Sequence, residues 1–326
     1  MINDLQDSFL LRLTERLAAG WQDLDPERAG RHRDFILKFQ QTDGGFAGRK
    51  GDSDLYYTSF AVRGLALLNA LDVARAQIIS SYLKSAAAKQ RYSLIDLVSW
   101  FYSAITIQLL GAGNFDELAQ DRNLAREPGA LPEIPDEISS ELETFRRPDG
   151  GYAKTHEGGV GSTYHTFLAV LCYEMIGRMP PDVAGIVRFF LSRRREDGGF
   201  VEIGVMKRSG ANPTAAAAVL LKRFEAIDRQ MLEGIEAYLS KVKGDEGGFR
   251  ANTQIPFCDL LSTFTGLLMT HELGLAPRID AEACRGYIDG LELAGGGFRG
   301  AAWDDESDPE YTFYGLGSLA LLRVMD

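Results

Sequence analysis

The stretch Asp43-Gly44-Gly45-Phe46 decides the fold of this chain, because the sequence repeats it four more times. The further copies read Asp149-Gly150-Gly151-Tyr152, Asp197-Gly198-Gly199-Phe200, Glu246-Gly247-Gly248-Phe249 and Gly295-Gly296-Gly297-Phe298. The last four copies lie 48 or 49 residues apart, and the first gap of 106 residues is about two such periods. A fixed period of this size is typical of a repeat architecture. We therefore expect most residues to have a structural role within a repeat.

Two kinds of helical pattern flank each motif. Before it lies an amphipathic segment, in which apolar residues recur at steps of three and four with charges between them. These segments are 33–41, 137–146, 183–194, 231–242 and 281–291. After the motif come a polar loop, a threonine and a helix that is apolar nearly all round, such as 60–71 or 313–324. The first kind suits an outer layer, and the second suits burial on all sides.

The glycines and the threonine of each repeat have local explanations. A Gly-Gly pair permits positive φ and close backbone approach, so we expect the motif to be architectural, with its aromatic residue packed between repeats. A threonine suits a helix N-cap or first turn. The repeat threonines are Thr58, Thr166, Thr214, Thr263 and Thr312.

A sixth unit without glycines lies in the long gap. Its segment Ser99–Gly111 resembles Ser262–Gly274, which pairs Asp96 with Asp259. Residues 112–135 contain three prolines and are expected to form an inserted loop. A connection of this length is usually functional or mobile. No strand-length alternating run is found, so we predict one all-α domain over residues 1–326: six helical hairpins with six parallel inner helices surrounded by six outer ones.

Composition limits the class of protein. Hydrophobic residues make up 45% and charged residues 25%, as in a soluble globular protein. The net charge of −11 argues against nonspecific nucleic-acid binding. No apolar run reaches the roughly 20 residues of a membrane span, and the N-terminus lacks a signal-peptide pattern. The cysteines, Cys172, Cys258 and Cys284, show no zinc or redox spacing. A cytoplasmic location is expected.

The repeats resemble those of the protein prenyltransferase β subunits, most closely the Rab geranylgeranyl transferase β subunits. The resemblance spans about residues 30 to 325 and implies an α/α toroid, a fold shared with squalene and class II diterpene cyclases. It also implies an isoprenoid diphosphate in a central cavity and a helical α-subunit partner, although one chain does not show whether a partner exists. The segments that carry it are 44–48 with 57–62 and 296–298 with 308–315.

In that family, zinc is held by an Asp-x-Cys pair that opens the fifth inner helix and by a histidine at the start of the sixth. The family aspartate falls on Asp259, the cysteine on Leu261 and the histidine on Tyr311. Asp259 is thus the only retained ligand position, whereas a catalytic zinc normally needs three protein ligands. The diphosphate clamp keeps one basic residue, Arg250, and its tyrosine falls on Ser262. We expect a degenerate zinc site and no cofactor.

Ligand-binding candidates lie where the inner helices begin. Parallel helices bring their N-termini to one rim, where helix dipoles and free N–H groups attract anions. Lys207 and Arg208 could meet a diphosphate there or be ordinary loop charge, and His165 could donate to a phosphate or be structural. Aromatic residues at the helix starts could wall an apolar pocket or pack the core. These are Tyr57, Trp100, Tyr164 and Phe264.

A second enzyme class fits the last repeat. Class II terpene cyclases protonate an alkene with the middle aspartate of Asp-x-Asp-Asp, directly before a repeat threonine. Here Asp308-Pro309-Glu310-Tyr311-Thr312 puts Glu310 in that place. Such an acid needs a raised pKa.

Three hypotheses follow. The first is a prenyltransferase-like enzyme that uses an isoprenoid diphosphate without the usual zinc. The second is a noncatalytic toroid that binds a lipid or a protein partner, and the third is a cyclase. The candidate catalytic residues are Asp259, Glu310 and Tyr311.

Overall fold

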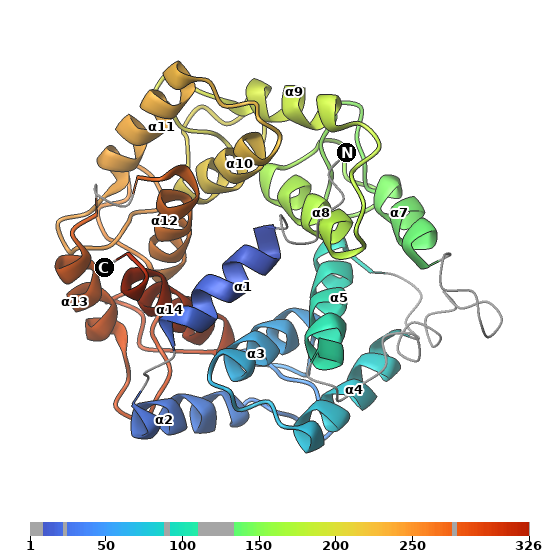
Figure 1. Ribbon diagram of the computed structural model, residues 1–326, viewed down its shortest axis with the longest axis vertical. Helices are drawn as coiled ribbons and strands as arrows, with labels where there is room; N and C mark the ends of the chain where they lie inside the picture. Colours follow the sequence, from blue (N-terminus) through green and yellow to red (C-terminus); the bar gives the residue numbers. More distant parts are fainter. Residues whose placement is uncertain (1–8, 22–24, 88–91, 110–133, 276–278, 326) are drawn as a thin grey trace.

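The computed structural model describes residues 9–21, 25–87, 92–109, 134–275 and 279–325. These ranges contain thirteen helices and no strand, so the all-α prediction is confirmed. Figure 1 shows two concentric layers of helices that close into a ring. The inner layer comprises α3 (Leu55–Leu67), α5 (Leu94–Leu109), α8 (Thr163–Met175), α10 (Ala211–Arg223), α12 (Leu260–Leu273) and α14 (Pro309–Arg323). The outer layer comprises α2 (Pro26–Leu37), α4 (Val73–Ala87), α7 (Ile134–Thr144), α9 (Val183–Arg193), α11 (Arg229–Val242) and α13 (Ala281–Leu291).

The inner helices begin at the same end of the ring. In four of them, the first N–H donates to a loop carbonyl of the following repeat: Leu94 to Lys154 (3.0 Å), Thr163 to Glu202 (3.0 Å), Ala211 to Ala251 (2.8 Å) and Leu260 to Gly300 (2.8 Å). The predicted parallel packing of the inner layer follows from this repeated bond. We call the axial region that the six inner helices enclose the lumen.

The Gly-Gly motifs are the joints between repeats. The first glycine of each pair has φ between 87° and 96°. A Cβ there would lie 2.0–2.7 Å from a carbonyl oxygen of the following outer helix, as at Gly198, which meets Gly234 O. Only glycine meets both conditions. The ring closes because the last pair docks on the first outer helix, where Gly296 meets Arg31 O.

The repeat threonine is not the N-cap. In four of the glycine-bearing repeats, the N-cap of the inner helix is the residue four positions before the repeat threonine. These N-caps are Asp54, Ser162, Asp259 and Asp308. The threonine Oγ1 instead accepts the N–H of the motif aromatic, as in Phe46 N–H to Thr58 Oγ1 at 2.9 Å. Three other repeats share this bond. Helices α3 and α14 therefore begin five and four residues before the predicted starts at 60 and 313.

The unit without glycines is capped differently. Asp96 accepts the N–H of Ser93, and Ser93 Oγ accepts the N–H of Asp96, which is a reciprocal capping arrangement. Ser93 therefore matches the N-cap Asp259, and the expected pairing of Asp96 with Asp259 is wrong by three residues. Leu97 stands where the other repeats have a threonine. This unit lacks the Gly-Gly-aromatic motif, so it has no aromatic N–H that a threonine hydroxyl would need to accept. The predicted loop at 112–135 lies outside the described residues, except that α7 already begins at Ile134.

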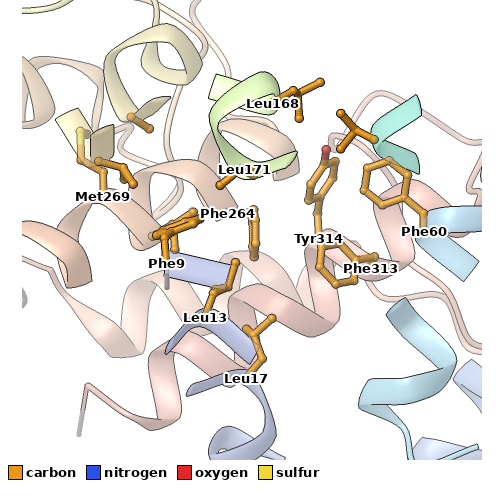
Figure 2. Packing of buried hydrophobic residues seen from close by; sticks show 14 of the residues in the cluster. Phe9, Leu13, Leu17, Phe60, Leu168, Leu171, Phe264, Met269, Phe313 and Tyr314 are labelled. Carbon is orange, nitrogen blue, oxygen red and sulfur yellow. The ribbon is translucent and has the colours of Figure 1, made fainter. Parts of the chain in front are cut away.

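A helix that the sequence reasoning missed crosses the centre of the ring. Helix α1 (Phe9–Gly20) lies inside the inner layer in Figure 1. Its residues Phe9, Leu13 and Leu17 are buried in the same cluster as Leu171 and Phe264 (Figure 2). The spacing of four between Leu13 and Leu17 is the amphipathic signal that could have revealed it.

Polar contacts fix α1 at the end of the ring where the inner helices finish. Arg16 and Arg12 both pair with the buried Glu272, next to the last residue of α12. The N–H of Phe9 donates to Glu174 of α8 at 3.0 Å. Arg323, the last residue of α14, donates to Gly20 O at 3.0 Å. Helix α1 therefore spans the carboxyl-terminal end of the lumen, which we call the closed end.

Candidate functional site

The second residue of each inner helix lies at the opposite end of the lumen. These six residues are Tyr56, Ile95, Tyr164, Asn212, Leu261 and Glu310. All six are at least partly exposed to water, although the fourth residue of each helix is fully buried. Side chains link them across neighbouring helices: Tyr56 bonds Glu310, and Thr265 of α12 donates to Asn212 at 2.7 Å. We call these six residues the mouth ring.

Glu310 is the ionisable centre of the mouth ring. Burial raises the pKa of its carboxyl group, and the hydrogen bond from Tyr56 only partly offsets this effect. The Tyr56 hydroxyl donates to Oε1 at 2.6 Å. Because Oε1 is the acceptor in this bond, the proton of the neutral acid belongs on Oε2. A carboxyl group with a raised pKa is suited to hold and donate a proton.

Aromatic rings line the lumen below Glu310. Tyr314 lies 5.2 Å from Phe60 and 5.3 Å from Phe264, measured between ring centroids (Figure 2). Tyr164 in the mouth ring is 37% exposed, yet burial raises the pKa of its hydroxyl to about 12. Aromatic side chains therefore lie directly beneath the mouth ring.

Arg63 is the site residue that sequence reasoning missed. Its guanidinium carbon lies 4.0 Å from the ring centroid of Phe60, 4.7 Å from that of Phe313 and 5.0 Å from that of Tyr102. These rings come from three neighbouring inner helices, α3, α14 and α5. A lone charge within the otherwise apolar run 60–71 was the available signal.

The rim around the mouth carries acids and few free donors. Three N-caps are the aspartates Asp54, Asp259 and Asp308. Arg49 is engaged by Asp308 at 2.9 Å and by Asp304 at 2.7 Å. In four helices, a loop carbonyl already accepts the first N–H. The expected attraction of this rim for anions is therefore largely cancelled.

The three residues at the positions of the family's zinc ligands make other contacts in this structure. Asp259 accepts the Ser262 N–H at 2.7 Å and the Ser262 hydroxyl at 2.8 Å, so its carboxylate caps α12. Leu261 is a mouth-ring residue, and the ring of Tyr311 lies 5.4 Å from the Arg49 guanidinium. Within the described ranges, no three His, Cys, Asp or Glu side chains are grouped so that they could hold a metal ion. These residues do not fit zinc.

The basic and aromatic candidates separate into different places. Lys207 and Arg208 are exposed on the loop before α10, and no ion pair joins either to a described residue. Trp100 is fully buried, and its Nε1 donates to Leu83 O of α4 at 3.0 Å. It packs between the two layers and does not line the lumen. Phe264 belongs to the aromatic cluster of the lumen.

The other two candidates lie at the third position of their helices. His165 is held against its N-cap by a hydrogen bond between Nδ1 and the Ser162 hydroxyl. Burial lowers the pKa of His165 to about 4, so the ring is neutral at physiological pH. Tyr57 packs against Gly48, where a Cβ would lie 2.3 Å from the ring. Both belong to the rim outside the mouth ring.

Comparison with known families identifies the class. The family described as prenyltransferase alpha-alpha toroid domain matches residues 9–111, 133–221 and 204–326. The chain belongs to this family, and the resemblance stated from the sequence is confirmed. A search of curated proteins gave no match. The described residues contain no helix both long and apolar enough to cross a membrane.

Several solved structures share the fold. The protein geranylgeranyltransferase-I of Candida albicans, complexed with GGPP, has a TM-score of 0.68 at 14% identity over 90% of each chain. A variant of the type II terpene cyclase MstE from Scytonema, in complex with geranylgeranyl dihydroxybenzoate as substrate, has a TM-score of 0.61 at 13% identity. That match covers 97% of this chain and 100% of the other. At such identities the likeness shows the fold alone.

Proposed function

We propose that this protein binds an isoprenoid or a similar long apolar ligand in its lumen, entering through the mouth ring. The observation that carries the proposal is the aromatic cluster of Phe60, Phe264 and Tyr314, which lies below the exposed Tyr164 of the mouth ring. Burial of apolar ligand surface against such a wall supplies binding free energy without a charged head group. Two structural neighbours are described with geranylgeranyl ligands, which agrees with this class of ligand.

We further propose that Glu310 is the general acid of a proton-initiated reaction. The Oε2 proton would add to an alkene of the ligand and leave a carbocation beside the rings of Phe264 and Tyr314, whose faces favour positive charge. Ring closure and loss of a proton from carbon would then give an isomer of the substrate, with the proton count restored. Tyr56 fixes the carboxyl orientation throughout.

Metal-dependent prenyl transfer fits the residues less well. Asp259 is committed to capping, Leu261 offers no ligand atom, and Tyr311 lies under Arg49. We infer a degenerate zinc site that needs no cofactor. The acidic N-caps at the rim also disfavour a diphosphate head group there. A helical protein partner, implied by the family resemblance, stays a prediction.

The test uses geranylgeraniol, a neutral isoprenoid. Native mass spectrometry should detect one bound molecule per chain, and gas chromatography should detect a cyclic isomer after incubation. Glu310→Gln should keep binding but lower turnover by about 100-fold or more, because it removes the proton donor. Glu233→Gln, on the exposed face of α11, is the matched control.

The outcomes separate the hypotheses. Binding with unchanged turnover in Glu310→Gln would refute the role of Glu310 as acid. Binding with no isomer in the wild type would favour a noncatalytic lipid-binding toroid. If geranylgeraniol does not bind at all, the isoprenoid proposal itself fails.

A further inference from the structure

Arg63 is a cation inside the lumen with unused hydrogen-bonding capacity. Its Cα lies seven residues after that of Tyr56 on α3, about 10 Å along the helix axis, and its side chain reaches back toward Ser59 and Phe60. Its Nε donates to Ser59 O at 3.1 Å. Its two terminal nitrogens have no hydrogen bond or ion pair with the described residues, although the side chain is only half buried.

Partly or fully buried arginines of this molecule pair with carboxylates or donate to backbone carbonyls, as Arg195 does. Arg49 is engaged by Asp304, Arg193 pairs with Asp149 at 2.6 Å, and Arg223 pairs with Glu174 at 3.1 Å. Arg63 instead has three aromatic rings around its guanidinium. Rings hold the cation by cation–π attraction and fix its direction, but they do not accept its N–H bonds. The fold therefore orients this guanidinium and leaves its terminal donors free.

Glu310 is a carboxyl group within electrostatic reach of Arg63, and it is already hydrogen-bonded to Tyr56. Its Oε1 accepts from Tyr56, and no ion pair joins it to Arg63. The free face of Arg63 is thus available to a ligand.

We propose that Arg63 binds the carboxylate of an acidic isoprenoid-type ligand within the lumen. A planar guanidinium with two free terminal nitrogens matches a carboxylate in a bidentate fashion. The subsite lies inside the ring, away from the acidic N-caps of the rim. This inference rests on the proposed function, because it names the class of ligand that the same lumen takes.

The experiment compares three ligands with one hydrocarbon chain: geranylgeranoic acid, its methyl ester and geranylgeraniol. Dissociation constants are measured at pH 8 by calorimetry with wild-type protein, Arg63→Gln, Arg63→Lys and Arg75→Gln. The wild type should bind the acid about tenfold or more tightly than the ester or the alcohol. Arg63→Gln should abolish this preference, measured as the ratio of the acid and alcohol dissociation constants in the same variant. Arg63→Lys should retain part of the preference for the acid, because lysine keeps the positive charge but cannot bind a carboxylate in a bidentate fashion.

Arg75 is the matched control, since it lies on the outer helix α4 and pairs with Asp72. Arg75→Gln should behave as the wild type. If the wild type binds the acid and the ester with equal affinity, the proposal is overturned. This comparison uses the wild-type protein alone, so it does not depend on whether a variant folds. An acid preference that survives in Arg63→Gln also overturns it. If the alcohol binds and the acid binds no more tightly, the role of Arg63 is refuted but the isoprenoid-binding proposal stands. If none of the three ligands binds, the isoprenoid-binding proposal fails as well.

Discussion

The two ends of the lumen are built from the opposite ends of the same six helices, and they differ in what surrounds them. At the mouth, acidic N-caps such as Asp308 lie beside a ring of half-exposed side chains. At the closed end, basic residues gather: Arg12 and Arg16 of α1 and Arg223 and Arg323 of the inner helices. Helix dipoles favour anions at N-termini and cations at C-termini, and the arginines at the closed end also neutralise the buried Glu174 and Glu272.

The comparison shows that one repeat can produce two different surfaces. Each repeat contributes an N-terminus to the mouth and a C-terminus to the closed end. A single additional helix, α1, then covers the second end with Phe9, Leu13 and Leu17. Under the proposed function, a ligand would enter from the mouth, where Glu310 and Tyr164 lie.

The largest expected effect comes from breaking the apolar contact of α1. Leu17→Asp places a carboxylate where the side chain is 5% exposed, so the free energy of unfolding should fall by about 3 kcal/mol or more. Urea denaturation measures the loss. Ala18→Asp adds the same charge on the exposed face of α1 and should change little. Equal effects of the two variants would show that α1 does not seal the closed end.

The polar contact of α1 should contribute less. Glu272 is 4% exposed and accepts from Arg12 and Arg16. Glu272→Gln should lower the free energy of unfolding by about 2 kcal/mol, because two arginines lose their buried charge partner. Ligand affinity at the mouth should stay unchanged. Glu233→Gln, which breaks an exposed pair with Arg229, should cost well under about 1 kcal/mol. A loss of ligand binding in Glu272→Gln would mean that the two ends are coupled.

The smallest effect concerns His165 at the rim of the mouth. Burial lowers its pKa from 6.5 to about 4, so the folded state binds fewer protons than the unfolded state at intermediate pH. The corresponding stability is present above pH 6.5 and is lost as the pH falls toward 4. Between pH 6.5 and pH 4, the free energy of unfolding should therefore fall less in His165→Gln than in the wild type, with a difference on the order of 1 kcal/mol. Thermal melts at stepped pH measure it, with the exposed His156→Gln as control. Parallel pH profiles for wild type and His165→Gln would contradict the burial of this ring.

The Gly-Gly repeats gave the correct fold class because their demands are local. A positive φ and a close carbonyl approach at Gly198 can be met only by glycine, so the requirement is written in the sequence. Periodicity then assigned inner and outer layers. The pairing of Asp96 with Asp259 failed because this unit lacks the motif that fixes the register, and Ser93 is its true cap.

The site was only partly predictable. Glu310 was found from its place before a repeat threonine, and Tyr164 from the density of aromatic residues at helix starts. Arg63 was missed because its significance depends on rings from α5 and α14, which are distant in sequence. Trp100 carried the same aromatic signal as Tyr164 but faces Leu83 in the outer layer. Residue type alone does not state the direction in which a side chain points.

By itself, the sequence determined a closed ring of helical hairpins, because glycine geometry and helical periodicity are properties of short segments. The tertiary structure decided which end of the ring is covered, since that depends on where α1 packs. It also decided that Asp259 caps a helix, that Glu310 meets Tyr56 and that Arg63 keeps free donors. Each of these outcomes depends on contacts between repeats, and such contacts form only when the ring closes.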